Sequence, residues 1–134
     1  MSENNLVKIK QFTSIGEDER GLTAQFSLPR QQDNFIFITR NAGSLSGNTW
    51  HEGKTPATNP KIFILLDGNI KLSWRKINTA ETYQANIMAP ATIEVSPHVT
   101  HNVEALSDCK IIECNSLGDI LNDRHRENVQ VGSF

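Results

Sequence analysis

A histidine and a lysine ten positions apart, His51 and Lys61, are residue types that together could perform proton chemistry. The imidazole of a histidine has a pKa near neutrality and can act as a general base. The ammonium group of a lysine can stabilise the negative charge that develops on an oxygen when a neighbouring proton is removed. The pair therefore suits the removal of a proton from a carbon next to a carbonyl group.

A third group must return the proton on the correct face of the ligand, and Thr49, His101 and Glu113 are the candidates. The sequence selects none of them. Arg20, which precedes Gly21, suits a bidentate contact with a diphosphate, although a turn before a strand is an equally good interpretation.

The composition predicts one globular domain. The chain has 134 residues, of which 37% are hydrophobic and 21% charged, and this length suits a single core. The 13 Lys and Arg residues are nearly balanced by 15 Asp and Glu, which predicts neither a nucleic-acid partner nor a membrane partner. We expect a single domain over residues 1–134, with an N-terminal strand or arm at 1–16 and a C-terminal helix and tail at 117–134.

The N-terminus and the cysteines indicate the compartment. The first five residues contain neither a positively charged region nor an apolar segment, so we expect no signal peptide and a cytoplasmic location. The longest strongly apolar run, residues 62–66, is far shorter than a membrane span. Cys109 and Cys114 are expected to be reduced and buried.

Short β-type runs, separated by turn residues about every ten positions, predict a sandwich or small barrel of about nine strands. The clearest runs are residues 22–28, 35–38, 62–66, 70–74, 82–88, 93–95, 103–105 and 110–114. The turn at residues 67–69 predicts a hairpin between the runs that flank it. Only residues 117–128 have a helical pattern.

Residues 41–60 interrupt this pattern with glycines, prolines and small polar residues. A long irregular segment inside a compact β domain is often functional, and this one contains Trp50 and His51. A solvated loop is the alternative interpretation.

The order of these motifs resembles the cupin superfamily. Cupins carry His-x-His and a carboxylate around a strand that ends in glycine, and then Pro-x-Gly-x-x-His. This chain has Thr49-Trp50-His51, then Lys61 before a strand ending at Gly68, then a Pro97-x-x-x-His101 segment. The resemblance covers about residues 18–126. It implies an all-β fold, an antiparallel cupin jelly-roll barrel (double-stranded β-helix) with a short C-terminal helix.

The chain differs from metal-binding cupins at two ligand positions. Thr49 occupies the position of the first histidine, and Lys61 occupies that of the carboxylate. An ammonium group offers no lone pair and repels a divalent cation. We therefore expect no metal and no other cofactor, with a site built on His51 and His101 as the weaker alternative.

The sequence is most similar to the RmlC-like cupins, which include sugar-nucleotide 3,4-ketoisomerases and dTDP-4-dehydrorhamnose 3,5-epimerases and work without metal. The epimerases have a histidine and a lysine ten residues apart, as His51 and Lys61 are, and the ketoisomerases have an early Asp-x-Arg-Gly, matched by residues 18–21. The resemblance implies that His51 and Lys61 are catalytic. It also implies that five residues bind the substrate: Arg20, Asn48, Thr49, His101 and Glu113.

The implied function is that of a metal-independent isomerase or epimerase acting on a nucleotide-linked 4-keto-6-deoxy sugar. The resemblance also implies a homodimer that exchanges N-terminal strands, for which the segment with Val7, Ile9 and Phe12 is the candidate. The catalytic tyrosine of the relatives has no counterpart, because the only tyrosine, Tyr83, lies in a different strand. A non-catalytic cupin that binds a small molecule or carbohydrate is therefore the alternative, and a metal-dependent cupin a weaker one.

Overall fold

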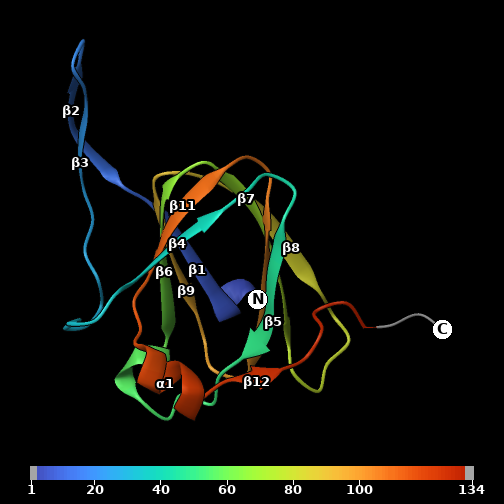
Figure 1. Ribbon diagram of the computed structural model, residues 1–134. Coiled ribbons are helices and arrows are strands. Elements are labelled where there is room, and N and C mark those ends of the chain that lie inside the picture. The colour runs from blue at the N-terminus through green and yellow to red at the C-terminus, as the bar shows by residue number, and fades with distance from the viewer. Residues whose placement is uncertain (1–2, 132–134) are drawn as a thin grey trace.

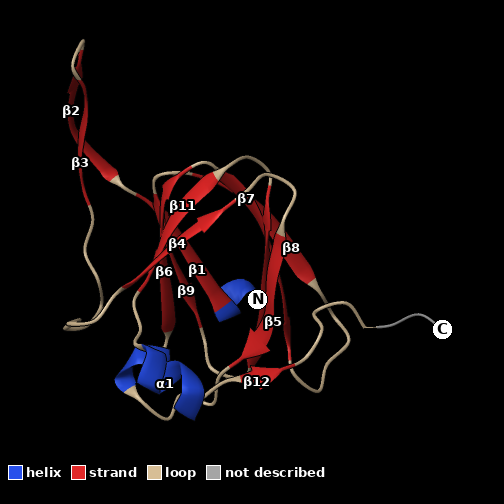
Figure 2. Cartoon of the chain, viewed as in Figure 1, coloured by secondary structure: helices blue, strands red, loops and turns tan. Residues whose placement is uncertain are grey.

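The structure is a computed structural model that describes residues 3–131, and most of them form two five-stranded antiparallel sheets (Figures 1 and 2). The first sheet consists, in spatial order, of β1 (Val7–Gln11), β9 (Ala91–Val95), β6 (Lys61–Asp67), β11 (Cys109–Glu113) and β4 (Ile36–Arg40). The second consists of β12 (His125–Arg126), β5 (Leu45–Trp50), β10 (Val99–Ala105), β7 (Asn69–Lys76) and β8 (Tyr83–Met88). The predicted antiparallel jelly roll is confirmed.

The hydrophobic core lies between the two sheets. In β7, the predicted alternation places Ile70, Leu72 and Trp74 on the inner face, where all three are buried. They pack in one cluster with residues of the opposite sheet, including Leu65 of β6 and Ile93 of β9. Burial of such side chains is worth about 1.5–3 kcal/mol each.

Strand β6 is apolar on both faces, as its sequence predicts. Ile62 and Ile64 face away from the core and form a second cluster with Cys114, onto which Phe12 and Leu28 pack. The other face starts at Lys61, so a charged residue begins a strand that is otherwise enclosed. Cys109 and Cys114 are free and buried, as predicted.

The predicted hairpin at residues 67–69 is wrong. β6 pairs with β9 and β11 in one sheet, whereas β7 pairs with β8 and β10 in the other. The turn therefore carries the chain from one sheet to the other. Gly68 has a φ of 94°, and a Cβ there would lie 2.3 Å from the carbonyl oxygen of Asp108, so only glycine fits this corner.

Two further boundaries differ from the sequence prediction. Residues 41–60 are not irregular throughout, because β5 lies within them. Gly47 and Asn48 in this strand have positive φ values, and the pairing of β5 with β10 shifts register at His101. This distortion hides the strand in the sequence. The helix α1 covers only Leu117–Asn122, because Asp123 turns into the protein.

A two-stranded hairpin, β2 (Thr13–Asp18) and β3 (Gly21–Gln25), projects away from the sheets (Figure 1). β1, by contrast, pairs with β9 of the same chain over its whole length. The predicted exchanged strand thus lies within its own sheet, and the hairpin that follows it stands apart. Residues 1–2 of the predicted arm and 132–134 of the predicted tail lie outside the described residues.

The remaining elements are short. Two 3-10 helices cover Glu3–Leu6 and Pro56–Thr58. Within residues 3–131, no helix has the length and apolar character needed to cross a membrane.

Candidate functional site

A cavity of about 290 Å³ lies between the two sheets near α1. Five of the seven predicted site residues line it: Thr49, His51, Lys61, His101 and Glu113. They come from β5, the loop after it, β6, β10 and β11. Ring and aliphatic groups of Phe63, Ile38, Val103 and Ile120 supply the apolar part of the wall.

At the inner end of the cavity His51, Lys61 and Glu113 form a connected group. The Lys61 Nζ lies 3.2 Å from Nε2 of His51 and 2.5 Å from Oε2 of Glu113. All three residues are buried. Asn115 donates a hydrogen bond from Nδ2 to the same Glu113 oxygen at 3.1 Å.

The ring of His51 is held in one tautomer. Its Nδ1 lies 2.5 Å from the backbone carbonyl oxygen of Asp123, which can only accept, so Nδ1 carries the proton. Nε2 is then an acceptor, and the Lys61 ammonium donates to it. Burial, reinforced by the charge of Lys61, lowers the pKa of His51, so the imidazole is neutral at pH 7.

Lys61 is in a strongly desolvated position. Its side chain is 5% exposed, and Nζ lies 5.6 Å from the centre of the Phe63 ring. Burial lowers the pKa of Lys61, and the carboxylate of Glu113 opposes this effect without cancelling it. The amine can therefore lose its proton more readily than a surface lysine.

His101 is also neutral. Burial lowers its pKa to about 3, and its Nδ1 donates to the carbonyl oxygen of Val99 at 3.0 Å. The ring packs edge-on against Phe63, 5.8 Å between centres, and lies 5.9 Å from the ring of His51. His101 thus forms a fixed polar wall beside the base.

Asp123, which the sequence did not single out, organises the loop that carries His51. Its buried carboxylate accepts hydrogen bonds from the backbone N–H groups of Glu52, Gly53 and Lys54 at 2.8–3.0 Å and from the hydroxyl of Thr58 at 2.7 Å. Burial opposes ionisation, but these donors outweigh it and lower the pKa of Asp123 to about 2. An aspartate in a polar tail gives no sequence signal for this role.

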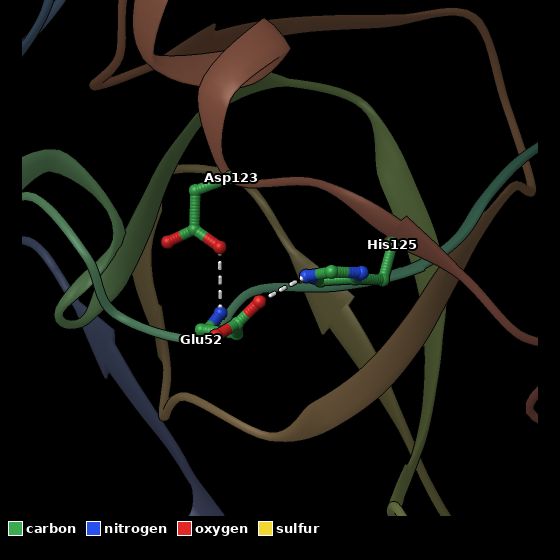
Figure 3. A group of neighbouring side chains, drawn as sticks. All are labelled: Glu52, Asp123 and His125. Carbon is green, nitrogen blue, oxygen red and sulfur yellow. Dashed lines mark hydrogen bonds and ion pairs between the residues drawn. The ribbon is translucent and has the colours of Figure 1, made fainter.

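Glu52, Asp123 and His125 form a group whose possible metal-ligand atoms lie within 4.8 Å of one another (Figure 3). The Asp123 carboxylate is already committed to four donors, and Glu52 pairs with Nε2 of His125 at 2.6 Å. His125 also stacks on Trp50, with 4.3 Å between ring centres. These contacts hold the segment after α1 against the loop after β5.

Two predicted site residues lie outside the cavity. The Oδ1 atom of Asn48 accepts from Asn102 and from the backbone N–H of Val129, which is a structural role. Arg20 lies at the tip of the projecting hairpin, where it pairs with Asp18 at 2.7 Å.

Three arginines at the edge of the cavity were not predicted: Arg40, Arg124 and Arg126. Within residues 3–131, none of them has an ion pair with a carboxylate. Arg124 and Arg126 are exposed and reach the cavity only because the chain turns back after α1. No pattern in the sequence places these arginines beside β4 and β5.

Comparison with known proteins identifies a family model that covers most of the chain. A family model described as "Polysaccharide biosynthesis C-terminal domain" matches residues 16–127. No curated protein matches this chain in sequence.

Several solved structures share the fold, which is that of the RmlC-like cupins. The sugar 3,4-ketoisomerase QdtA from Thermoanaerobacterium thermosaccharolyticum, in complex with TDP, has a TM-score of 0.70 at 15% identity, covering 91% of this chain and 88% of that one. RmlC, a dTDP-6-deoxy-D-glucose-3,5-epimerase from Legionella pneumophila bound to dTDP-4-keto-L-rhamnose, has a TM-score of 0.69 at 14% identity, covering 93% and 74%. A dTDP-4-dehydrorhamnose 3,5-epimerase from Sulfolobus tokodaii has a TM-score of 0.72 at 14% identity, covering 94% and 79%.

Proposed function

This chain belongs to the polysaccharide biosynthesis C-terminal domain family, and on that premise we propose that it is a metal-independent isomerase or epimerase of a nucleotide-linked 4-keto-6-deoxy sugar. The single observation that carries this proposal is the position of His51 Nε2, 3.2 Å from Lys61 Nζ at the inner end of the cavity. A neutral base and a cation are adjacent there, as proton removal beside a carbonyl requires.

In the proposed reaction the keto oxygen of the sugar approaches Lys61, and the adjacent C–H faces His51. Contact with the keto oxygen draws the Lys61 ammonium away from Nε2, which frees the lone pair of the base. His51 then takes the proton while the positive charge of Lys61 stabilises the enolate. Thr49 and Glu113 remain the candidates for returning a proton, since both line the cavity, whereas His101 is held by Val99.

The basic edge of the cavity supports a diphosphate as part of the ligand. The guanidinium groups of Arg40, Arg124 and Arg126 present bidentate donors to phosphate oxygens. QdtA is crystallised with TDP, a QdtA variant with TDP-4-keto-6-deoxyglucose, and the Legionella RmlC with a dTDP-keto sugar. We propose the same ligand class for this protein, in a cytoplasmic setting.

We also propose that the chain is one domain that forms a homodimer. The hairpin formed by β2 and β3 carries Arg20 away from the cavity of its own chain. A second copy that receives this hairpin would give Arg20 a route to a diphosphate at the partner's cavity. Arg20 remains a proposed substrate-binding residue on this basis.

A non-catalytic binding cupin is the second candidate, because the pocket contains no phenol. Tyr83, the only tyrosine, stacks on Trp74 with 6.0 Å between ring centres and does not line the cavity. A protein of this kind would bind nucleotide sugars without converting them.

Incubation of the protein with TDP-4-keto-6-deoxyglucose, followed by NMR of the sugar, distinguishes the two candidates. We expect a new keto-sugar isomer to form, and His51→Asn to lower kcat by roughly 10²–10⁴, the usual effect of losing a general base. His98→Asn is the matched control, because His98 is exposed at a turn with a φ of 64°, which asparagine tolerates. Tight binding without conversion would favour the binding protein.

A further inference from the structure

The environment of Lys61 suits two roles: a positive charge that stabilises an enolate, and a neutral amine that acts as a nucleophile. An amine attacks a carbonyl carbon only when it is unprotonated, and burial favours the neutral form. Lys61 is 4% exposed yet lines the cavity, so a ligand can reach it. Surface lysines of this chain such as Lys54, with a side chain 53% exposed, lack this enclosure.

The neighbours of Lys61 can accept and return a proton. Nε2 of His51 lies 3.2 Å from Nζ and accepts a hydrogen bond from the ammonium, because the ring proton is on Nδ1, so it can take the proton that Lys61 releases. Oε2 of Glu113 lies 2.5 Å away. The other groups that act on Lys61 are the charge of Arg124, which disfavours the ammonium, and that of Asp123, which favours it.

We propose that Lys61 forms an imine with the keto carbon of the substrate, so that the proton removed by His51 comes from a carbon next to an iminium ion. This inference rests on the proposed function and gives Lys61 a covalent role within it. The ligand class is a ketone with a hydrogen on the adjacent carbon.

The step is balanced without an oxidant or a reductant. The Lys61 ammonium gives one proton to His51, and the amine lone pair forms a C–N bond as the carbonyl π bond breaks. A second proton passes from nitrogen to the resulting alkoxide. His51 then returns its proton to this hydroxyl, which leaves as water, and the C–N bond becomes an iminium. The ammonium and ketone have become an iminium and water, with one positive charge on each side.

Proton removal follows from the same arrangement. His51, neutral again, takes the proton from the adjacent carbon, and the C–H electron pair moves into the iminium to give a neutral enamine. A proton is then returned to the opposite face of the same carbon, which regenerates the iminium, and addition of water to the iminium releases the epimerised ketone and the amine. The imine therefore serves epimerisation beside the carbonyl and not migration of the keto group. An iminium is a stronger electron sink than a hydrogen bond, so stabilisation of the negative charge needs no phenol in the pocket, and Tyr83 lies outside it. The proton returned to carbon still comes from a third group, for which Thr49 and Glu113 are the candidates.

Reductive trapping tests the proposal. The full-length protein is incubated with TDP-4-keto-6-deoxyglucose and sodium cyanoborohydride at neutral pH, and its peptides are mapped by mass spectrometry. We expect an adduct at Lys61 with the mass of the ketone less one oxygen atom. Labelling at Lys61 should exceed that at each other lysine by on the order of tenfold or more, because Lys61 lines the cavity beside a base and burial favours its neutral amine. The other lysines are Lys8, Lys10, Lys54, Lys71, Lys76 and Lys110.

Two variants complete the test. Lys61→Arg keeps the charge but forms no imine, so turnover should fall by on the order of 10²–10³ or more. Lys54→Arg, a surface control, should leave both turnover and Lys61 labelling unchanged. The trapping measurement uses the wild type, so its result stands even if Lys61→Arg does not fold.

The outcomes separate this inference from the proposed function. Conversion of the sugar without an adduct at Lys61, or with turnover retained in Lys61→Arg, overturns the imine and leaves the isomerase. An adduct at Lys61 without conversion supports the imine and overturns the isomerase. Neither conversion nor adduct overturns both.

Discussion

His51 acquires its chemistry from two contacts, one at each ring nitrogen. The carbonyl oxygen of Asp123 fixes the proton on Nδ1, and Lys61 occupies Nε2. Neither contact belongs to the residues adjacent to His51 in sequence. These two contacts give a loop histidine a fixed tautomer and orientation. Lys61, which occupies the position of a carboxylate in metal-binding cupins, donates a hydrogen bond to it.

Lys61 leads to a prediction about metal content. An ammonium 3.2 Å from Nε2 of His51 blocks that nitrogen from a cation. Purified protein analysed by inductively coupled plasma mass spectrometry should therefore contain no stoichiometric zinc, iron or manganese. One equivalent of metal that is lost in both His51→Ala and His101→Ala would contradict this interpretation.

His101 leads to a prediction about acid stability. The unfolded chain binds a proton at this residue below about pH 6.5, whereas the native state resists protonation down to about pH 3. The unfolded state thus binds more protons in this window, and the free energy of unfolding falls as the pH is lowered from 6.5 to 3. One proton contributes at most about 1.4 kcal/mol per pH unit.

Thermal unfolding between pH 7 and pH 4 measures this effect. The midpoint of His101→Phe should fall less steeply with pH than that of the wild type, while His98→Asn should follow the wild type. Equal slopes for His101→Phe and the wild type would show that His101 is protonated in the native state.

The loop after β5 depends on the segment after α1. Residues 52–54 direct three backbone N–H groups at one carboxylate, that of Asp123, and the hydroxyl of Thr58 adds a fourth donor. The same residue accepts from His51 through its backbone. One position near the end of the described chain therefore sets the conformation of the loop and the direction of the base.

Asp123→Asn should loosen this loop. The carboxylate of Asp123 has two acceptor oxygens for four donors, whereas the amide of asparagine has only one. The NH₂ group of the amide would also face backbone N–H groups. Together these changes should lower the free energy of unfolding by about 1–3 kcal/mol. Hydrogen exchange should accelerate at the amides of Glu52, Gly53 and Lys54. Asp33→Asn is the control, because Asp33 is exposed. Unchanged exchange in Asp123→Asn would mean that other contacts hold the loop.

On the scale of the whole molecule, the hairpin formed by β2 and β3 is the feature that the fold of one chain leaves unexplained. It projects from the sheets with Ile15 64% exposed and Leu22 49% exposed (Figure 1). An isolated two-stranded hairpin is at best marginally stable in water. A partner that covers these side chains is therefore expected.

We predict that the protein is a homodimer at micromolar concentration and that Ile15→Glu makes it monomeric, measured by size-exclusion chromatography with light scattering. Leu121→Glu is a matched control, since Leu121 is 71% exposed on α1, which lies at the end of the molecule opposite the hairpin (Figure 1). A monomeric wild type, or an Ile15→Glu variant that stays dimeric, would remove the hairpin from the interface.

The sequence alone indicated the β fold and the inner residues of the cavity. Alternation of apolar residues identified the strands, because a strand with one buried face repeats every two residues. His51 and Lys61 were predicted together because only the loop of residues 52–60 separates two residues that the cupin pattern already relates.

Only the tertiary structure decided which distant residues complete the site. Asp123, Arg124 and Arg126 follow His51 by more than 70 positions. Because the chain folds back after α1, Asp123 contacts His51, and Arg124 and Arg126 line the cavity. The sequence pattern indicates which face of a strand is apolar. It does not indicate that a polar segment such as residues 123–126 will pack across one end of the barrel. The turn at Gly68 shows the same limit: its residues indicate a reversal of the chain, and only the packing of the two sheets determines that the reversal joins one sheet to the other.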